Sequence, residues 1–192
     1  MEKVVVFIDG SNVLFSAINS GISPAFDYSK LVKKLVGDRK LVRAYFYDAP
    51  LKQNDEPERY KKQQSFLEHL RMTEYFELRL GRLVAQTKNG VTSQHQKGVD
   101  VKIAVDMMDF GSNGSYDTAI LMSGDSDLVS AVEYVKRIGR HVELAFFDKC
   151  YELKKASDKF TPLTKELFAD CQRDPKNLSA KGPAKILKPA KI

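Results

Sequence analysis

The sequence has only two cysteines, Cys150 and Cys171, and three histidines among 192 residues. Two cysteines cannot build the disulfide framework of a small secreted domain, and they lack the grouped spacing of a zinc site. No hydrophobic run is longer than a strand, so no segment is predicted to span a bilayer. These absences argue against a disulfide scaffold, a zinc module and a membrane partner, and they favour a cytoplasmic location.

The chain instead has the composition of a globular domain, with 43% hydrophobic and 29% charged residues. Such a balance is sufficient for a core of its own. The apolar run at residues 4–8 follows a single lysine and has no small-residue cleavage site behind it. We therefore interpret this run as a core strand and not as a signal peptide.

The net charge of +6 is unevenly distributed. Residues 172–192 contain six basic side chains and one acidic side chain, so most of the excess lies there. This stretch is also rich in Lys, Pro, Ala and Gly and has no hydrophobic periodicity, which is typical of disorder. We predict one domain over residues 1–171 and a basic, disordered tail over 172–192, which either contacts a polyanion electrostatically or only aids solubility.

Strand-like and helix-like segments alternate along the domain. Apolar or alternating runs predict strands, and runs with helical spacing predict helices. The polar stretch 86–97 reads as a loop, with Asn89-Gly90 as a turn signal. The repeated order predicts an α/β fold with a mainly parallel sheet and helices on both faces. The predicted strands are 4–8, 41–47, 76–84, 117–122 and 141–147, and the predicted helical segments are 11–17, 28–36, 57–72, 99–110, 127–138, 151–155 and 162–168.

One strand-to-helix junction carries two carboxylates, in the stretch Ser123-Gly-Asp125-Ser-Asp127. Ligands of open α/β sheets bind at the carboxyl ends of the strands. Two neighbouring carboxylates repel each other, and a cation or a proton between them relieves the repulsion. Helix capping explains one of the two acids but not both. Of the pair, we expect Asp125 to contact a metal, because it lies nearer the strand end.

Other aspartates lie at earlier junctions. Asp9 follows the first strand and precedes Asn12, and Asp100 opens a predicted helix after Lys97. Taken singly, each has an ordinary explanation, in a turn, a cap or a favourable first helical turn. Asp106 and Asp109 lie further along the same helix, and we expect both to be solvated.

Together these junctions bring acidic groups to one edge of the predicted sheet. Carboxylates without a cluster of His or Cys favour a hard ion, Mg²⁺ or Mn²⁺. Such an ion binds phosphate oxygens and activates water, and the matching reaction is hydrolysis of a phosphodiester. The candidate ligands are Asp9, Asp100, Asp125 and Asp127.

Three motifs, taken in order, resemble the NYN domain, and more closely its LabA-like (DUF88) branch within the PIN-like nuclease superfamily. They are Val-Phe-Ile-Asp9-Gly-Ser-Asn12, Lys97-Gly-Val-Asp100-Val-Lys-Ile-Ala-Val-Asp106-Met and Ser123-Gly-Asp125-Ser-Asp127-Leu. The resemblance covers roughly residues 1 to 150. It implies a three-layer, Rossmann-like α/β/α fold and a metal-dependent ribonuclease. In that setting the four aspartates form the acidic cluster, Asn12 and Ser123 support metal-bound water or substrate, and Lys97 contacts a phosphate.

Several alternatives remain at this point. A haloacid-dehalogenase-like phosphatase would need an aspartate where Phe7 stands, and a von Willebrand A-type adhesion site would need a serine in place of Val13. The stronger rival is a catalytically weak NYN-fold module that binds RNA or a nucleotide. In either NYN case the expected partner is RNA, single-stranded or structured. A homo-oligomer is compatible with the sequence, although nothing in it indicates one.

Overall fold

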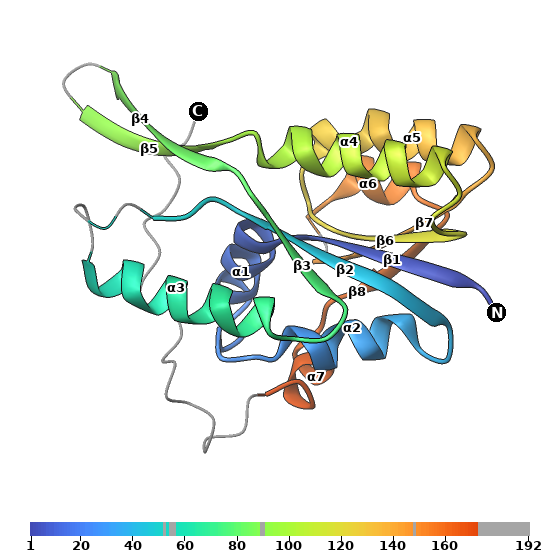
Figure 1. Ribbon diagram of the computed structural model, residues 1–192, viewed down its shortest axis with the longest axis horizontal. Helices are drawn as coiled ribbons and strands as arrows, with labels where there is room; N and C mark the ends of the chain where they lie inside the picture. Colours follow the sequence, from blue (N-terminus) through green and yellow to red (C-terminus); the bar gives the residue numbers. More distant parts are fainter. Residues whose placement is uncertain (52, 54–56, 89–90, 148, 173–192) are drawn as a thin grey trace.

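The computed structural model describes residues 1–172 except 52, 54–56, 89–90 and 148, and the side chains of 85–95 are left out of the description. Its centre is a six-stranded sheet in the order β3-β2-β1-β6-β7-β8 (Figure 1). All five neighbouring strand pairs in this sheet are parallel. The strands are β1 (Lys3–Asp9), β2 (Lys40–Asp48), β3 (Phe76–Leu80), β6 (Thr118–Met122), β7 (His141–Phe146) and β8 (Lys159–Pro162).

Helices cover both faces of this sheet and produce three layers (Figure 1). One face carries α1 (Gly10–Asn19), α2 (Tyr28–Val36) and α3 (Pro57–Arg71), with the short α7 (Lys165–Ala169) beside α2. The other face carries α4 (Val99–Ser112), α5 (Val129–Arg137) and α6 (Tyr151–Ala156). A 3₁₀ turn, η1 (Ser126–Leu128), precedes α5. The predicted three-layer α/β/α fold with a parallel sheet is confirmed.

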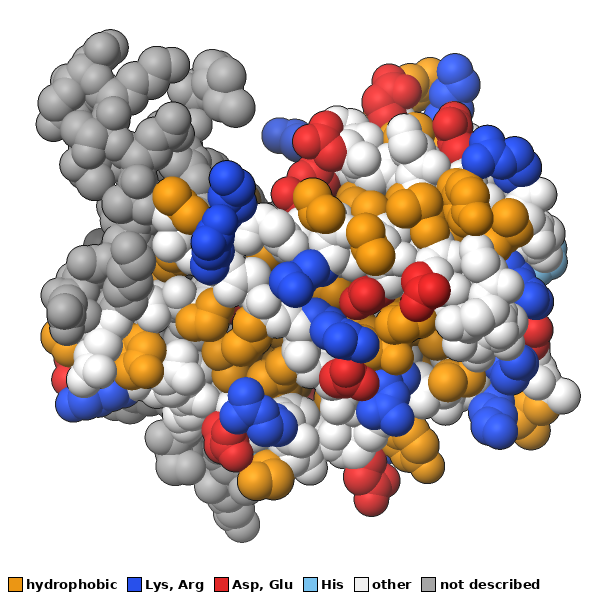
Figure 2. Space-filling view, turned by 45° about the horizontal axis from the view of Figure 1, so that its top comes forward, with side chains coloured by type: hydrophobic (Ala, Val, Ile, Leu, Met, Phe, Trp, Pro, Cys, Tyr) orange, Lys and Arg blue, Asp and Glu red, His pale blue; other side chains and the backbone are white. Residues whose placement is uncertain are grey.

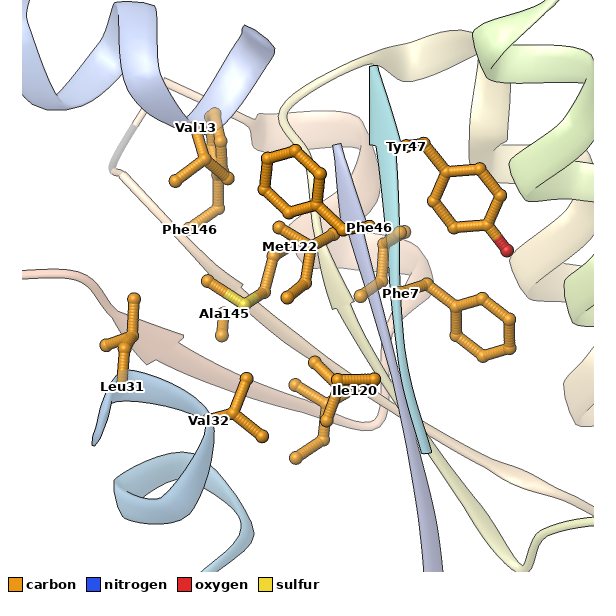
Figure 3. Close-up of a cluster of buried hydrophobic side chains, with 14 of the residues drawn as sticks. Phe7, Val13, Leu31, Val32, Phe46, Tyr47, Ile120, Met122, Ala145 and Phe146 are labelled. Atoms are coloured by element: carbon orange, nitrogen blue, oxygen red, sulfur yellow. The ribbon is translucent and has the colours of Figure 1, made fainter. Parts of the chain in front are cut away.

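The hydrophobic pattern accounts for this arrangement. Strand β1 is buried on both sides, as its unbroken apolar run predicted, because helices lie above and below it. Successive strand side chains point to opposite faces. Figure 3 shows Phe7 and Tyr47 on one side of the sheet, whereas Phe46 and Met122 lie on the side of α1 and α2. The core is therefore two hydrophobic layers that share one sheet.

The region after β3 differs from the sequence prediction. The expected strand 76–84 is interrupted at Gly81, and the chain continues as β4 (Arg82–Lys88). The expected loop 86–97 is wrong for its described residues, since β5 (Val91–Lys97) pairs with β4 in an antiparallel hairpin. The predicted turn at 89–90 lies outside the described residues. In Figure 1 the hairpin projects away from the layers. Its sequence over 86–97 is mostly polar and lacks the alternating apolar pattern by which a strand is predicted.

The end of the described chain brings a second difference. The predicted helical segment 162–168 is shorter, because Pro162 ends the edge strand β8 and α7 begins only at Lys165. Gln172 still belongs to the folded part: it forms an isolated antiparallel bridge with Phe26, and its backbone oxygen accepts a hydrogen bond from Lys30. Residues 173–192 lie outside the described part, so the division at 171 stays a prediction.

Two general properties of the described residues bear on partners. Among them, no helix combines the length and the hydrophobicity needed to cross a lipid bilayer. Figure 2 shows Lys and Arg side chains interspersed with Asp and Glu, without a single continuous basic surface on that face. This mixture agrees with the sequence, in which the excess positive charge lies mostly after residue 171.

Candidate acidic site

The sheet changes direction between its two central strands. From β1 the chain proceeds to β2 on one side, and from β6 it proceeds to β7 on the other. In open α/β sheets this switch point leaves a crevice at the carboxyl ends of the strands, where ligands bind. Asp9 ends β1, and Ser123 directly follows β6. The two predicted site segments therefore lie on neighbouring strands at the switch point.

Asp9 connects these strands through both oxygens of its carboxylate. Its side chain is only 4% exposed. Oδ1 accepts a hydrogen bond from the backbone N–H of Asn12 at 3.0 Å and so caps α1. Oδ2 accepts one from the hydroxyl of Ser123, which is fully buried, at 3.2 Å. Asp9 therefore serves as a helix cap, as its ordinary explanation held, and also faces the turn after β6.

The turn after β6 is held by a short series of hydrogen bonds. The side-chain oxygen of Asn12 accepts from the N–H of Gly124 at 3.3 Å, and the Ser123 hydroxyl oxygen accepts from the N–H of Asp125 at 3.2 Å. Oδ1 of Asp125 then accepts from the N–H of Asp127 at 3.0 Å and caps η1. Asp125 is thus the capping residue of the pair, and its Oδ2 has no hydrogen-bond donor among the described residues.

Glycines at both junctions make room for aromatic rings beneath the site. A Cβ at Gly10 would lie 2.3 Å from the ring of Phe46, and a Cβ at Gly124 would lie 2.2 Å from the ring of Phe146. Both distances are far below van der Waals contact. Each ring comes from a neighbouring strand, so the two glycines let the site turns lie directly on the core.

The electrostatics of Asp9 reflect its burial among other acids. The pKa of its carboxyl is raised to about 7, chiefly by desolvation. The hydrogen bond from Asn12 lowers this pKa, the charge of Asp100 raises it, the hydrogen bond from Ser123 lowers it, and the charge of Asp48 raises it. A neighbouring cation would reverse this balance and favour the carboxylate form.

Asp100 provides the electrostatic connection to the remaining acids. It lies half-buried in the first turn of α4. Desolvation raises the pKa of its carboxyl, and the charges of Asp125 and Asp127 raise it further. Asp127 itself is exposed on η1. Asp100 is therefore coupled by charge to acids at the two other junctions, although no direct hydrogen bond joins it to them in the described residues.

Lys97, the predicted phosphate contact, ends β5 and is exposed. Within the described part of the chain it forms no ion pair, and neither does any of the four aspartates. An exposed lysine at the edge of an acidic site remains available to an anionic ligand. The role of Lys97 stays a prediction.

The donor set fits a hard divalent cation better than a soft one. In the described residues no three His, Cys, Asp or Glu side chains are close enough to form a ready-made metal cage. Mg²⁺ commonly takes only one or two carboxylates and keeps several water ligands, so it does not require such a cage. A buried carboxylate near other negative charges, such as Asp9, is the kind of oxygen donor that gains most from such an ion.

Asp48 is an acidic residue at this edge that sequence reasoning missed. It ends β2, one residue beyond Tyr47, which pairs with Asp9 in the sheet register. It is 7% exposed, and desolvation raises the pKa of its carboxyl. The rule that identified Asp9, an acid at the end of a predicted strand, applies equally to Asp48. Its side chain faces hydrogen-bond donors from several elements, as described below.

Asp106 corrects a second prediction about acidic residues. We expected it to be solvated, but it is partly buried on α4 and accepts a hydrogen bond from the Tyr47 hydroxyl at 2.8 Å. Its Oδ2 also lies 3.5 Å from Nε of Arg79. Asp109 is exposed as expected. Asp106 is therefore bonded to a strand of the sheet. It also has an ion-pair partner, which none of the four candidate ligands has among the described residues.

Comparisons with known proteins agree with this fold. The model of the NYN domain family matches residues 3–164. The chain is similar to the Low amplitude and bright protein LabA of Synechococcus elongatus, with 25% identity over 167 residues, covering 84% of each protein. A crystal structure of a protein of unknown function from Vibrio parahaemolyticus has a similar fold, with a TM-score of 0.66 and 24% identity, covering 86% of this chain and 94% of that one.

Proposed function

The chain belongs to the NYN domain family, and from this premise we propose that it is a Mg²⁺- or Mn²⁺-dependent ribonuclease that hydrolyses RNA phosphodiester bonds. Membership supports a nuclease-like, RNA-related function in general. The metal, the reaction and the assignment of residues are the proposal. The observation that carries it is that Asp9 ends β1 at the switch point of the sheet and is bonded to the turn after β6 that carries Asp125 and Asp127, while the charge of Asp100 acts on Asp9.

The roles of the aspartates follow from their placement. Asp9 is held rigidly by two hydrogen bonds, so it would fix the position of the ion. Asp125 uses one oxygen as a cap and has the other without a described donor, so it would be the second ligand. Asp100 and Asp127 would bind directly or through water. When bound, the ion would supply a more acidic water and neutralise charge on the phosphate.

The polar residues around the aspartates would serve the substrate. Asn12 and Ser123 keep the two site turns together. The side-chain NH2 of Asn12 would donate to a water or a phosphate oxygen. The Ser123 hydroxyl already donates to Asp9, so it would support the substrate by holding the turn that carries Asp125. Lys97 lies exposed at the end of β5 and would bind a phosphate of the RNA backbone. Such contacts position a nucleic acid without reading its sequence.

The rival is an NYN-fold module that binds RNA or a nucleotide without cleaving it. The observation that favours the rival is that the carboxylate of Asp9 is 4% exposed and already accepts hydrogen bonds through both oxygens. In that case RNA or nucleotide would bind to the same edge, and no product would form.

Cleavage of a labelled RNA with Mg²⁺, Mn²⁺ or EDTA distinguishes the two functions. We expect cleavage with either ion, none with EDTA, and a loss of at least 100-fold in Asp125→Asn, the scale of losing an interaction central to the transition state. Asp109→Asn, which removes an exposed acid from α4, is the control and should keep full activity. Cleavage that survives both EDTA and Asp125→Asn would refute the metal mechanism, whereas RNA binding without any cleavage would support the rival.

A further inference from the structure

The carboxylate of Asp48 joins three elements that border the acidic site. Oδ1 accepts hydrogen bonds from the Ser11 hydroxyl of α1 at 2.8 Å, from the N–H of Ala49 at 2.8 Å and from the side-chain amide of Gln96 on β5 at 3.2 Å. Oδ2 accepts from the side-chain amide of Gln63 on α3 at 3.1 Å. A carboxylate offers only acceptors, so it is suited to receive four donors at once.

Asp48 also holds both strands of the hairpin at its base. Its backbone oxygen accepts from the N–H of Gly81, just before β4, at 2.8 Å. Its side chain accepts from Gln96, the penultimate residue of β5. The two strands approach closely there, because a Cβ at Gly81 would lie 2.9 Å from the backbone oxygen of Lys97. The point where the hairpin rejoins the domain is therefore set by Asp48.

The connection that leaves this point leads directly to the acidic site. Three residues lie between Gln96 and Asp100. Between them, Gly98 adopts a left-handed φ of 83° and stands at the N-cap of α4, which has no side-chain cap of its own. Val99 is buried and fixes the first turn to the core. The start of α4 thus depends on neighbouring contacts. Just before it, Lys97 pairs with Arg82 in the hairpin, and the side-chain amide of Gln96 donates to Asp48 and to the Ser11 hydroxyl.

We propose that Asp48 is a positioning residue that, through Gln96, fixes the connection from β5 to α4 and so keeps Asp100 beside the other candidate ligands. This inference rests on the proposed function, because it takes Asp100 as part of the metal site. It extends that function by making the seating of the hairpin a condition for a complete site.

A matched pair of substitutions separates positioning from general stabilisation. Gln96→Met and Gln63→Met each remove one amide donor from the same carboxylate and keep a similar side-chain length. Gln96→Met also removes a bond to the Ser11 hydroxyl. Gln63→Met also removes a bond to the Ala49 oxygen and the acceptor of the Leu51 N–H, so it is the harsher control. Only Gln96 lies on the path to Asp100; Gln63 lies on α3. Both variants avoid Asp48 itself, whose replacement could prevent folding. The measurements are Mn²⁺ binding to the full chain and hydrogen exchange of the backbone amides of residues 97–102 without metal.

We expect Gln96→Met to weaken Mn²⁺ binding about 10-fold, the usual effect of losing a group that orients a ligand, and to speed exchange at 97–102. Gln63→Met should keep Mn²⁺ affinity within about 2-fold and leave that exchange unchanged, since its donor lies outside the path. Equal effects in the two variants, or unchanged exchange in Gln96→Met, would overturn the proposal. If the unsubstituted chain binds no Mn²⁺, the proposed function fails, and the exchange comparison alone still decides whether Gln96 fixes this connection.

Discussion

The side-chain oxygen of Asn12 accepts a hydrogen bond from the backbone N–H of Gly124, across 3.3 Å. The bond joins the first turn of α1 to the turn after β6, which are 112 residues apart in the chain. A second hydrogen bond joins the same two turns, from the Ser123 hydroxyl to Asp9. Two side chains at the start of α1 therefore hold the turn after β6. The geometry of the acidic site therefore depends on a small number of polar contacts that substitution can remove one at a time.

Asn12→Ala tests the first of these contacts. Removing the acceptor leaves the Gly124 N–H unpaired and frees the turn that carries Asp125. We expect a loss of about 1 kcal/mol in the free energy of unfolding and at least a 10-fold loss of RNA cleavage. Asn19→Ala, at the exposed end of α1, should change neither. Loss of stability with full cleavage would show that Asn12 is a structural residue only.

The pH dependence of stability tests the environment of Asp9. Its pKa is about 7 in the folded protein and near the ordinary 3.8 when unfolded, so the folded state binds the extra proton between these values. Stability in EDTA should therefore fall as pH rises from about 4 to about 7, by on the order of 4 kcal/mol, and then level off. Urea unfolding at several pH values measures this slope.

Asp9→Asn is the variant that identifies the group. It keeps the side-chain shape and removes the titration, so its stability should fall less over the same pH range. A residual slope is expected, because burial also raises the pKa values of Asp48 and Asp100. An identical pH profile in the variant and the unsubstituted protein would contradict the raised pKa of Asp9.

Gly124→Ala tests the contact between the site turn and the core. The new methyl group would lie 2.2 Å from the ring of Phe146, so either the turn or the ring must move. We expect a loss of about 1–3 kcal/mol in urea unfolding. Adding Phe146→Leu should recover part of this loss, because the smaller side chain makes room. If the stability losses of Gly124→Ala and Phe146→Leu simply add in the double variant, the Phe146 ring does not clash with the new methyl group.

Deletion of residues 173–192 tests the predicted tail. The cut is placed after Gln172, because that residue still bonds to the folded part. The deleted segment has six basic residues and one acidic residue. We expect an unchanged melting temperature and a salt dependence of single-stranded RNA binding that is flatter by up to about 3 in the log–log slope. A much lower melting temperature would contradict a disordered tail, and an unchanged slope would assign it to solubility.

The sequence predicted those elements whose hydrophobic pattern reports burial. The apolar run of β1 and the spacing of Ile103 and Met107 on α4 both correspond to buried faces. The hairpin escaped prediction because residues 86–97 lack the alternating apolar pattern that predicts a half-buried strand. Asp48 escaped for a different reason: its importance lies in donors from α3 and β5, and no local pattern predicts which distant residues will meet at one carboxylate.

The site residues show the same limit. Their positions at strand ends could be predicted, because parallel strands deliver their carboxyl ends to one edge. Which of Asp125 and Asp127 caps the following turn could not be predicted, since both flank Ser126 and either could do so. Only the structure shows that Asp125 is the cap and that Asp127 is exposed.

The pairing of β1 with β6 also has a consequence for how the protein matures. The hydrogen bond between Asp9 and Ser123 spans 114 residues, and contacts of such long range form after the local ones. During synthesis, the residues of β1 and Asp9 therefore leave the ribosome long before those of β6 and Ser123. The acidic site is completed late in synthesis, and a prematurely terminated chain that lacks β6 has no such site.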